Sequence, residues 1–382
     1  MVEVMPLVDV GLGNSTYLVE IGDGRALVVD AGRDLRGVRE AAGRRGLRIA
    51  FAADTHLHAD FLTGALQLAA DEGTRVVAAA RGRREFDHLG LDDGDEVDLG
   101  GLRLRALYTP GHTDEHLSYE LLDGGTSVGV FTGGSLIVGS AARTDLLGPE
   151  RTEELTRAQY RSLRRLAALD DDVAVWPTHG AGSFCSAPAG DRRITTIGRE
   201  KAGNPLLGAP DEDAFVAALL ASLGSYPAYF AELAEINRRG PALLDTRSAG
   251  RLARLPVSTV DRRRQEGAAV VDVRPVAAHA AGHVPGALSI PLRPAFAVWL
   301  GWLVPRGTPL VVVRDDDQDP EEIAWQAHKI GYDDLLGELD GGMPAWTAAG
   351  HPASRTALVP AGQLDAALDS GHVDLLDVRQ AG

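Results

Sequence analysis

Two histidines and an aspartate lie close together in one short segment, residues 55–64, where their types and spacing could hold a metal ion. His56, His58 and Asp60 stand at positions i, i+2 and i+4, soon after the apolar run Ile49–Ala53. Such a run predicts a buried strand, and on the loop that follows it these side chains can converge on one point. Imidazole and carboxylate are ligands that zinc, iron and manganese share. The segment therefore predicts part of a metal site.

Two further histidines follow predicted strands in the same way. His112 lies in residues 110–113, Pro-Gly-His-Thr, and His179 lies in residues 177–180, Pro-Thr-His-Gly. Taken singly, each of these is best explained as an ordinary polar loop histidine. Three histidine-bearing strand ends in this order are what a metal cleft at one edge of a sheet needs.

The elements that must position these residues are read from hydrophobic patterning and turn signals. Strands are predicted over 16–20, 26–30, 49–53, 76–79, 96–99, 102–108, 117–122, 127–132 and 173–176. Helices are predicted over 35–44, 150–169, 211–223 (with Asp211 as its cap) and 228–239. From residue 259 the pattern changes to strand–helix alternation, with helices at 260–266 and 321–331 and strands at 268–273, 288–291 and 310–313, which predicts a small α/β unit.

These changes in pattern divide the chain of 382 residues into parts. We expect one domain over 1–240, a linker over 241–258 and a second domain over 259–356. The sequence Val271-Asp272-Val273-Arg274 recurs as Leu376-Asp377-Val378-Arg379. Residues 357–382 are therefore interpreted as the start of a truncated repeat of the second domain.

Composition excludes several classes of function. The net charge of −16 argues against binding of a nucleic-acid backbone, which needs a basic surface. The single cysteine, Cys185, excludes a disulfide framework and a CxxC motif. No apolar run is long enough to span a bilayer, and the first residues lack the features of a signal peptide. We therefore expect a cytoplasmic protein without nucleic-acid or membrane partners.

The three histidine segments together resemble the metallo-β-lactamase superfamily over about residues 1–240. The resemblance implies an αββα sandwich with metal at the edge of two packed sheets. Within that superfamily, the chain resembles the persulfide dioxygenase branch on residues 59–61, 131–136, 142–146, 179–185, 204–205 and 227–230. Residues 259–352 resemble a rhodanese domain, on residues 271–274, 282–287 and 341–346.

Two positions depart from the superfamily pattern. Phe61 stands where a second metal ion usually has a histidine ligand, and Gly134 stands where an aspartate usually ligates or bridges metal. A bridged two-metal hydrolase site would lack both ligands, so we expect a mononuclear site. We also expect the substitution Gly134→Asp to raise iron occupancy.

In persulfide dioxygenases iron is held by two histidines and that aspartate, which carries over here as His56 and His112 without a third member. We expect His58 to complete a three-histidine site for Fe(II), with zinc as the alternative metal. Asp60 or water is a weaker substitute for His58. His179 matches the position of a second metal ligand, and we expect it to form a hydrogen bond in the cleft instead.

Three other residues have two interpretations each. Arg143 could pair with a substrate carboxylate or form a salt bridge with Asp145. His116 is interpreted as a loop histidine rather than a ligand, and Cys185 as a packed thiol rather than a nucleophile.

The rhodanese-like domain lacks the thiolate that sulfur transfer requires. The expected cysteine position, directly after Leu310–Val313, is Arg314, and residues 259–382 contain no cysteine. We expect this domain to serve structure, docking or dimerisation.

Four functions remain open. The first is an iron persulfide dioxygenase that oxidises a low-molecular-weight persulfide, such as glutathione persulfide, to sulfite. The second is a zinc-dependent hydrolase of thioesters. The third is a non-enzymatic sulfur-binding or regulatory protein, and the fourth is a scaffold in a biosynthetic pathway. The expected partner is a small thiol or persulfide, and a homodimer is an arrangement that the sequence leaves open.

Overall fold

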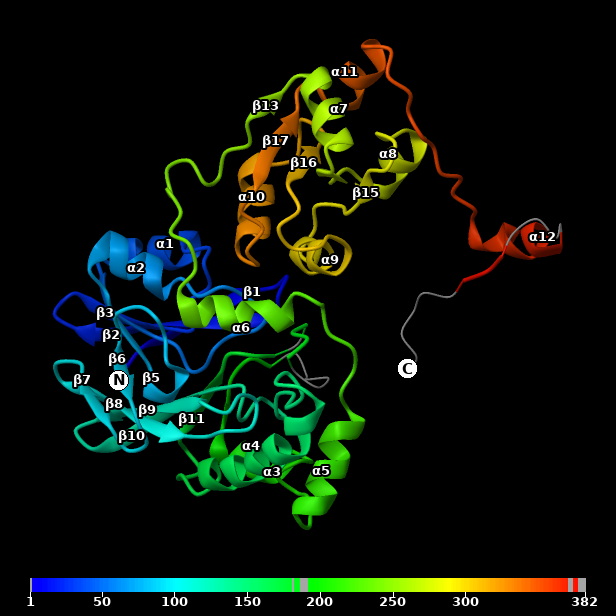
Figure 1. Cartoon of the computed structure of the whole chain (residues 1–382). Helices are drawn as coiled ribbons and strands as arrows, with labels where there is room; N and C mark the ends of the chain where they lie inside the picture. Colours follow the sequence, from blue (N-terminus) through cyan, green and yellow to red (C-terminus); the bar gives the residue numbers. More distant parts are fainter. Residues whose placement is uncertain (1, 181, 186–191, 370–373, 377–382) are drawn as a thin grey trace. The chain divides into compact units, whose positions relative to one another are not determined.

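The structure, a computed structural model, describes residues 2–180, 182–185, 192–369 and 374–376 (Figure 1). Its strands are β1 (Val4–Asp9), β2 (Asn14–Gly22), β3 (Arg25–Val29), β4 (Arg48–Ala53), β5 (Arg75–Ala79), β6 (Leu89–Leu91), β7 (Glu96–Asp98), β8 (Leu102–Tyr108), β9 (Leu117–Asp123), β10 (Thr126–Gly133), β11 (Ala174–Pro177), β12 (Thr195–Thr196), β13 (Arg254–Leu255), β14 (Ala269–Asp272), β15 (Leu288–Ser289), β16 (Leu310–Val313) and β17 (Leu335–Leu339). Its α-helices are α1 (Arg36–Arg44), α2 (Ala65–Glu72), α3 (Pro149–Leu166), α4 (Ile197–Gly203), α5 (Glu212–Ala221), α6 (Phe230–Arg239), α7 (Val257–Gln265), α8 (Val276–Ala281), α9 (Phe296–Leu303), α10 (Pro320–His328), α11 (Gly342–Ala348) and α12 (Leu364–Asp369), with short 3₁₀ helices at Ala80–Gly82 and Ala361–Gln363.

The chain divides into two compact units, and neither is continuous in sequence. The first comprises Met1–Leu252, Arg293–Thr308 and Asp319–Leu335. The second comprises Ala253–Leu292, Pro309–Gln318 and Leu336–Gly382. Helices α9 and α10 therefore belong to the first unit, although they come late in the chain.

Two six-stranded sheets form the centre of the first unit. One has the order β1-β2-β3-β4-β5-β6 and the other the order β12-β11-β10-β9-β8-β7. Their facing side chains, among them Leu27, Phe51, Leu104, Tyr119 and Phe131, form one buried core. Burial of this apolar surface holds the two sheets together.

Helices cover the outer face of each sheet. Val38 of α1 and Leu68 of α2 pack on the first sheet, and Leu163 of α3 and Phe215 of α5 pack on the second. Asp211 caps α5 by accepting the backbone N–H of Ala214, as its position in the sequence predicted. The predicted αββα sandwich is confirmed.

The direction of the strands explains why one edge collects the polar loops. Strands β3, β4, β5 and β6 are parallel neighbours, and β10 is parallel to β11. Their carboxyl ends therefore meet at the same edge of each sheet. The loops after β4, β8, β10 and β11 all leave from such ends.

The second unit is built on a five-stranded sheet in the order β13-β17-β16-β14-β15. The pairs β13–β17, β14–β15 and β14–β16 are parallel, as predicted for a small α/β domain. Val260, Val270, Val311 and Trp346 belong to its buried core.

The structure bears on two expectations about the organisation of the chain, the linker over 241–258 and the repeated motif at 376–379. Strand β13 lies inside residues 241–258, which we expected to be a linker, and its two residues pair with β17 in the rhodanese-like sheet. Most of the repeated motif at 376–379 falls outside the described residues. Among the residues that the structure does describe, no helix is both long enough and apolar enough to cross a bilayer.

Candidate metal centre

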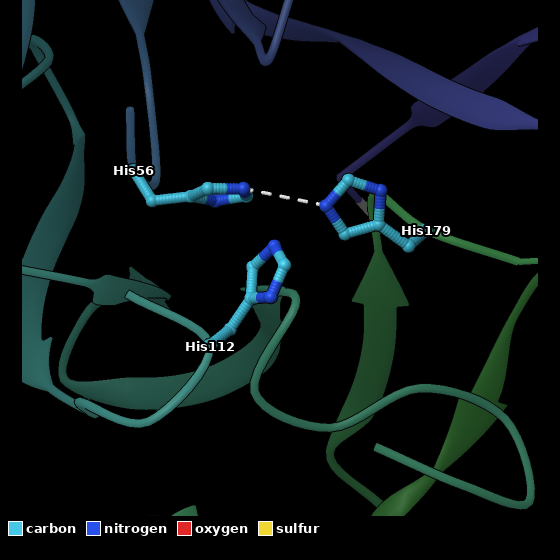
Figure 2. Close-up of side chains that lie close together, drawn as sticks. All are labelled: His56, His112 and His179. Atoms are coloured by element: carbon cyan, nitrogen blue, oxygen red, sulfur yellow. Dashed lines mark hydrogen bonds between the residues drawn. The ribbon is translucent and has the colours of Figure 1, made fainter. Parts of the chain in front are cut away.

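His56, His112 and His179 come together at the edge of the sandwich from three separate loops. Their side chains are at most 1% exposed. One ring nitrogen from each lies within 4.8 Å of the other two (Figure 2). The Nε2 atoms of His56 and His179 are only 3.3 Å apart.

The opposite ring nitrogen of each histidine faces the protein. His56 Nδ1 contacts the hydroxyl of Thr55 at 2.9 Å, and His112 Nδ1 contacts the backbone carbonyl of Arg143 at 2.7 Å. His179 Nδ1 lies 3.4 Å from Asp60 Oδ2. Contacts of this kind fix the ring orientation of a metal-ligating histidine. All three rings are thus held toward a common point, where His56 Nε2 and His179 Nε2 share a hydrogen bond and His112 Nε2 has no partner among the described residues.

Several buried polar atoms around this point lack hydrogen bonds. They are His112 Nε2, His58 Nδ1 and both carboxylate oxygens of Asp60. An unsatisfied buried polar group costs free energy, so a cluster of them needs a partner. A cation bound between His56, His112 and His179 would supply a partner for His112 Nε2, and these residues therefore fit a metal ion.

The protonation states also suit a metal. Burial, together with the charge of neighbouring histidines, lowers the pKa of His56 well below its ordinary value. Burial and His179 lower the pKa of His112 to about 3. Neutral imidazole is the form that binds metal.

His58 lies beside His56, with ring centroids 4.1 Å apart, and one of its ring nitrogens is paired with Asp30. Its Nε2 lies 3.1 Å from Asp30 Oδ1, and both side chains are fully buried. Burial alone would lower the pKa of His58, but the charge and hydrogen bond of Asp30 raise it above its ordinary value. In this structure the group that contains His56 and His112 takes His179 as its third member, because His58 is paired with Asp30.

Asp30 was missed in the sequence. It follows β3 at the same sheet edge, and it also accepts the backbone N–H and the hydroxyl of Thr55 and the hydroxyl of Thr178. The signal that could have revealed it is an acidic residue directly after a buried strand that runs parallel to β4.

Asp60 lies beside the histidine cluster. Within 4.8 Å, its carboxylate forms a second group with His58 and His179, so His179 belongs to both groups. The site thus has one carboxylate in reach despite the glycine at position 134.

A buried polar scaffold holds the loop that carries His56, His58 and Asp60. The side-chain amide of Asn237 donates to the carbonyls of His58 and Phe61, and its oxygen accepts the N–H of Thr63. Arg84 pairs with Asp54 at 3.0 Å and also contacts the carbonyl of His56. Neither Asn237 nor Arg84 was singled out from the sequence.

The two departures from the superfamily pattern have visible consequences. Phe61 stacks on His58 with ring centroids 4.1 Å apart and offers no ligand atom. A Cβ atom on Gly134 would lie 2.4 Å from the His112 ring. An aspartate at position 134 would displace that ring, so the structure argues against our expectation that Gly134→Asp raises iron occupancy.

The remaining candidates, Arg143, His116 and Cys185, are bonded to or packed against other groups of the protein. Arg143 forms a two-point salt bridge with Asp145 and donates to the carbonyls of Phe184 and Gly224. Its side chain is 3% exposed, which favours the structural interpretation over substrate binding. His116 contacts Thr109 through Nδ1 and accepts the N–H of Gly134 through Nε2. Burial raises the pKa of the Cys185 thiol well above its ordinary value, which favours a packed thiol.

Comparison with known proteins assigns families to both parts of the chain. Residues 9–179 match the metallo-beta-lactamase superfamily, and residues 256–349 match the rhodanese-like domain. A hydroxyacylglutathione hydrolase of Cereibacter sphaeroides is 30% identical over an alignment of 254 positions, which covers 59% of this chain and 93% of the relative.

Two further relatives bear the names of two different enzymes. A hydroxyacylglutathione hydrolase of Methylococcus capsulatus is 35% identical over 44% of this chain and 62% of its own length. Human mitochondrial persulfide dioxygenase ETHE1 is 28% identical over 50% of this chain and 70% of its length. The chain spans less than two thirds of the length of the first hydrolase relatives that it matches.

One solved structure resembles most of the chain. A metallo-beta-lactamase of Staphylococcus aureus shares 27% identity, with a TM-score of 0.76, over 88% of this chain and 98% of that one. Together with the histidine loops and the αββα sandwich, these matches show that the chain belongs to the metallo-β-lactamase superfamily and continues into a rhodanese-like domain.

Proposed function

We propose that the chain is a persulfide dioxygenase that binds one Fe(II) ion through His56, His112 and His179. The observation that carries the proposal is the convergence of three ring nitrogens, one from each of these buried histidines. Phe61 and Gly134 remove the ligands that a bridged pair of metals would use, which favours a single ion. The similarity to human persulfide dioxygenase supports the reaction class.

Bound Fe(II) would supply the redox chemistry and the open coordination positions that non-haem oxygenases use. The overall reaction takes a persulfide, O₂ and water to a thiol and sulfite, so the outer sulfur loses four electrons to O₂. The protein's own part is to hold the rings in place. Thr55 and the carbonyl of Arg143 fix His56 and His112, and Asp60 faces His179.

A second candidate function is zinc-dependent hydrolysis of a glutathione thioester. The relatives named hydroxyacylglutathione hydrolases, at 30–35% identity, favour it. In that case the same three histidines would hold zinc, which activates water for attack on a carbonyl.

The test compares both reactions on one preparation. The protein is loaded with Fe(II) or Zn²⁺ without oxygen, and then given glutathione persulfide with O₂, or lactoylglutathione. We expect O₂ uptake with sulfite release only in the iron form, and a loss of about 100-fold or more in His56→Ala. His88→Ala is the matched control, because His88 lies outside the cluster and contacts the carbonyl of Phe86. Thioester hydrolysis by the zinc form without O₂ uptake by the iron form would replace this proposal with the second candidate.

A further inference from the structure

A cleft of about 710 Å³ lies in the first unit, behind the loop that carries the histidines. It is lined by Leu57, Arg81, Gly82, Arg83, Tyr108, Asp114, Glu115, Arg151 and Arg238. Four guanidinium groups thus face two carboxyl groups, in a chain whose net charge is −16. Neither His56, His112 nor His179 is among the lining residues, so the cleft is distinct from the metal centre.

Two of these arginines have guanidinium groups available for a ligand. Among the contacts of the described residues, the side chain of Arg83 has neither a hydrogen bond nor an ion pair. Arg81 lies 3.5 Å from Asp92 without a hydrogen bond, and its guanidinium sits over the Tyr108 ring at 4.5 Å. Tyr108 therefore presents Arg81 in a fixed orientation, and most of the side chain stays exposed.

The other two arginines of the lining, Arg151 and Arg238, already form ion pairs with carboxylates of the protein. Arg151 contacts Asp114 at 3.4 Å and Glu154 at 3.0 Å. Arg238 contacts Glu85 and Glu235, and it also donates to the carbonyl of Arg83. This last contact fixes the backbone of Arg83, which has a positive φ of 48°. A non-glycine residue held in that conformation costs free energy, and such positions cluster at binding sites.

Leu57, one of the residues that line the cleft, belongs to the loop that carries His56 and His58. Leu57 stands between His56 and His58, and its backbone N–H donates to Glu115 Oε1 at 2.6 Å. Glu115 is 5% exposed and lies against Gly82, where a Cβ would come within 3.4 Å of its Cγ. A ligand in the cleft would therefore rest on the segment that positions two histidines.

We propose that this cleft binds a small oxyanion through Arg83 and Arg81. The planar fork of guanidinium matches the geometry of carboxylate, phosphate and sulfur oxyanions, and it can bind them with two parallel hydrogen bonds. The same chemistry has two sources, a free inorganic anion or the carboxylate of a peptide thiol. The proposal does not depend on which reaction the metal centre performs.

The test is isothermal titration of the full chain with three probes, namely inorganic phosphate, sulfite and reduced glutathione. We expect saturable binding of at least one probe, weakened about tenfold or more by Arg83→Gln. Arg81→Gln should also weaken it. Both side chains are exposed, so circular dichroism should show an unchanged fold. Binding of phosphate or sulfite identifies an inorganic anion, and binding of glutathione alone identifies a carboxylate.

Two controls make the outcome decisive. Arg247→Gln removes another exposed arginine of the first unit, outside the cleft, and should leave binding unchanged. His88→Ala alters a histidine outside both the histidine cluster and the cleft lining, and it should also leave binding unchanged. The proposal is overturned if none of the three probes binds saturably, or if Arg83→Gln binds as the wild type does.

Discussion

His179 contacts both the histidine cluster and the carboxylate of Asp60. Its Nε2 lies 3.3 Å from His56 Nε2, and its Nδ1 faces the carboxylate of Asp60. It thus links the histidine cluster to the carboxylate nearest to it. His58, which is closer in sequence to His56, is instead committed to the buried Asp30.

This arrangement predicts different effects for two conservative substitutions. His179→Gln should reduce metal affinity by about 100-fold, because it removes a ligand. His58→Gln should reduce it by about tenfold or less, since the glutamine amide can still donate to Asp30. Metal content after dialysis against a chelator, measured by elemental analysis, gives both values.

The comparison needs a check on folding, because His58 is fully buried. Thermal unfolding of the metal-free variants supplies it. If His58→Gln loses the metal and His179→Gln keeps it, then the ligands are His56, His58 and His112, as the sequence predicted.

The sequence predicted which residue types would gather here, and it predicted the edge at which they meet. Histidines after strands β4, β8 and β11 had to converge once those strands ran in one direction. The pairing of His58 with Asp30 was not predictable, because Asp30 follows a strand that carries no histidine. The position of His179 in the cluster was not predictable either, because it depends on a backbone bridge between His179 and Asn14.

Helix α10 reaches the metal-ligand loop, although it lies within the residues that match the rhodanese-like domain. The carbonyl of Lys329, directly after α10, accepts the N–H of Leu62. Arg33, which is 2% exposed, donates to the carbonyl of His328 and to Asp333. These contacts lie inside the first unit, so segments of the rhodanese-like sequence support the metal-ligand loop.

The pH dependence of Asp333 tests this support. Burial alone would raise the pKa of Asp333, but the hydrogen bond from His328 and the charge of Arg33 lower it below its ordinary value of 3.8. A carboxyl group with a lowered pKa contributes stability above its unfolded pKa and loses it as pH falls through its folded pKa. Asp333→Asn should therefore lower the free energy of unfolding at pH 7 by about 1 kcal/mol, since a half-exposed carboxylate is partly screened by solvent.

Urea unfolding at pH 7 and at pH 3, which is below the ordinary pKa of 3.8, measures this difference. The gap between wild type and Asp333→Asn should be smaller at pH 3. Asp34→Asn serves as a control. Asp34 is another carboxylate of the first unit, and it pairs with Arg36 at the surface. An equal gap at both pH values would show that the Asp333 carboxylate contributes no pH-dependent stability.

Elements with strong local signals were predictable, and those decided by tertiary packing were not. Asp211 at the cap of α5 is such a local feature, and it was predicted. Helix α9 was missed because its apolar residues surround it almost completely, so it shows no helical periodicity. Gly301 of α9 lies so close to Tyr229 that a Cβ would come within 2.1 Å of the ring, a contact that only the folded chain reveals.

The two units differ in the chemistry that their side chains allow. The first unit holds the buried histidines, Asp60 and the arginine-lined cleft. In the second unit Arg314, which lies where we expected the rhodanese cysteine, pairs with Glu338, which is 7% exposed. We therefore expect all chemistry of this chain to take place in the first unit.

The most direct test of the account is a crystal structure of the iron-loaded protein with anomalous difference maps collected above and below the iron absorption edge. The account predicts one iron peak, bound by the Nε2 atoms of His56, His112 and His179. A map without such a peak, or a peak held by other residues, would contradict it.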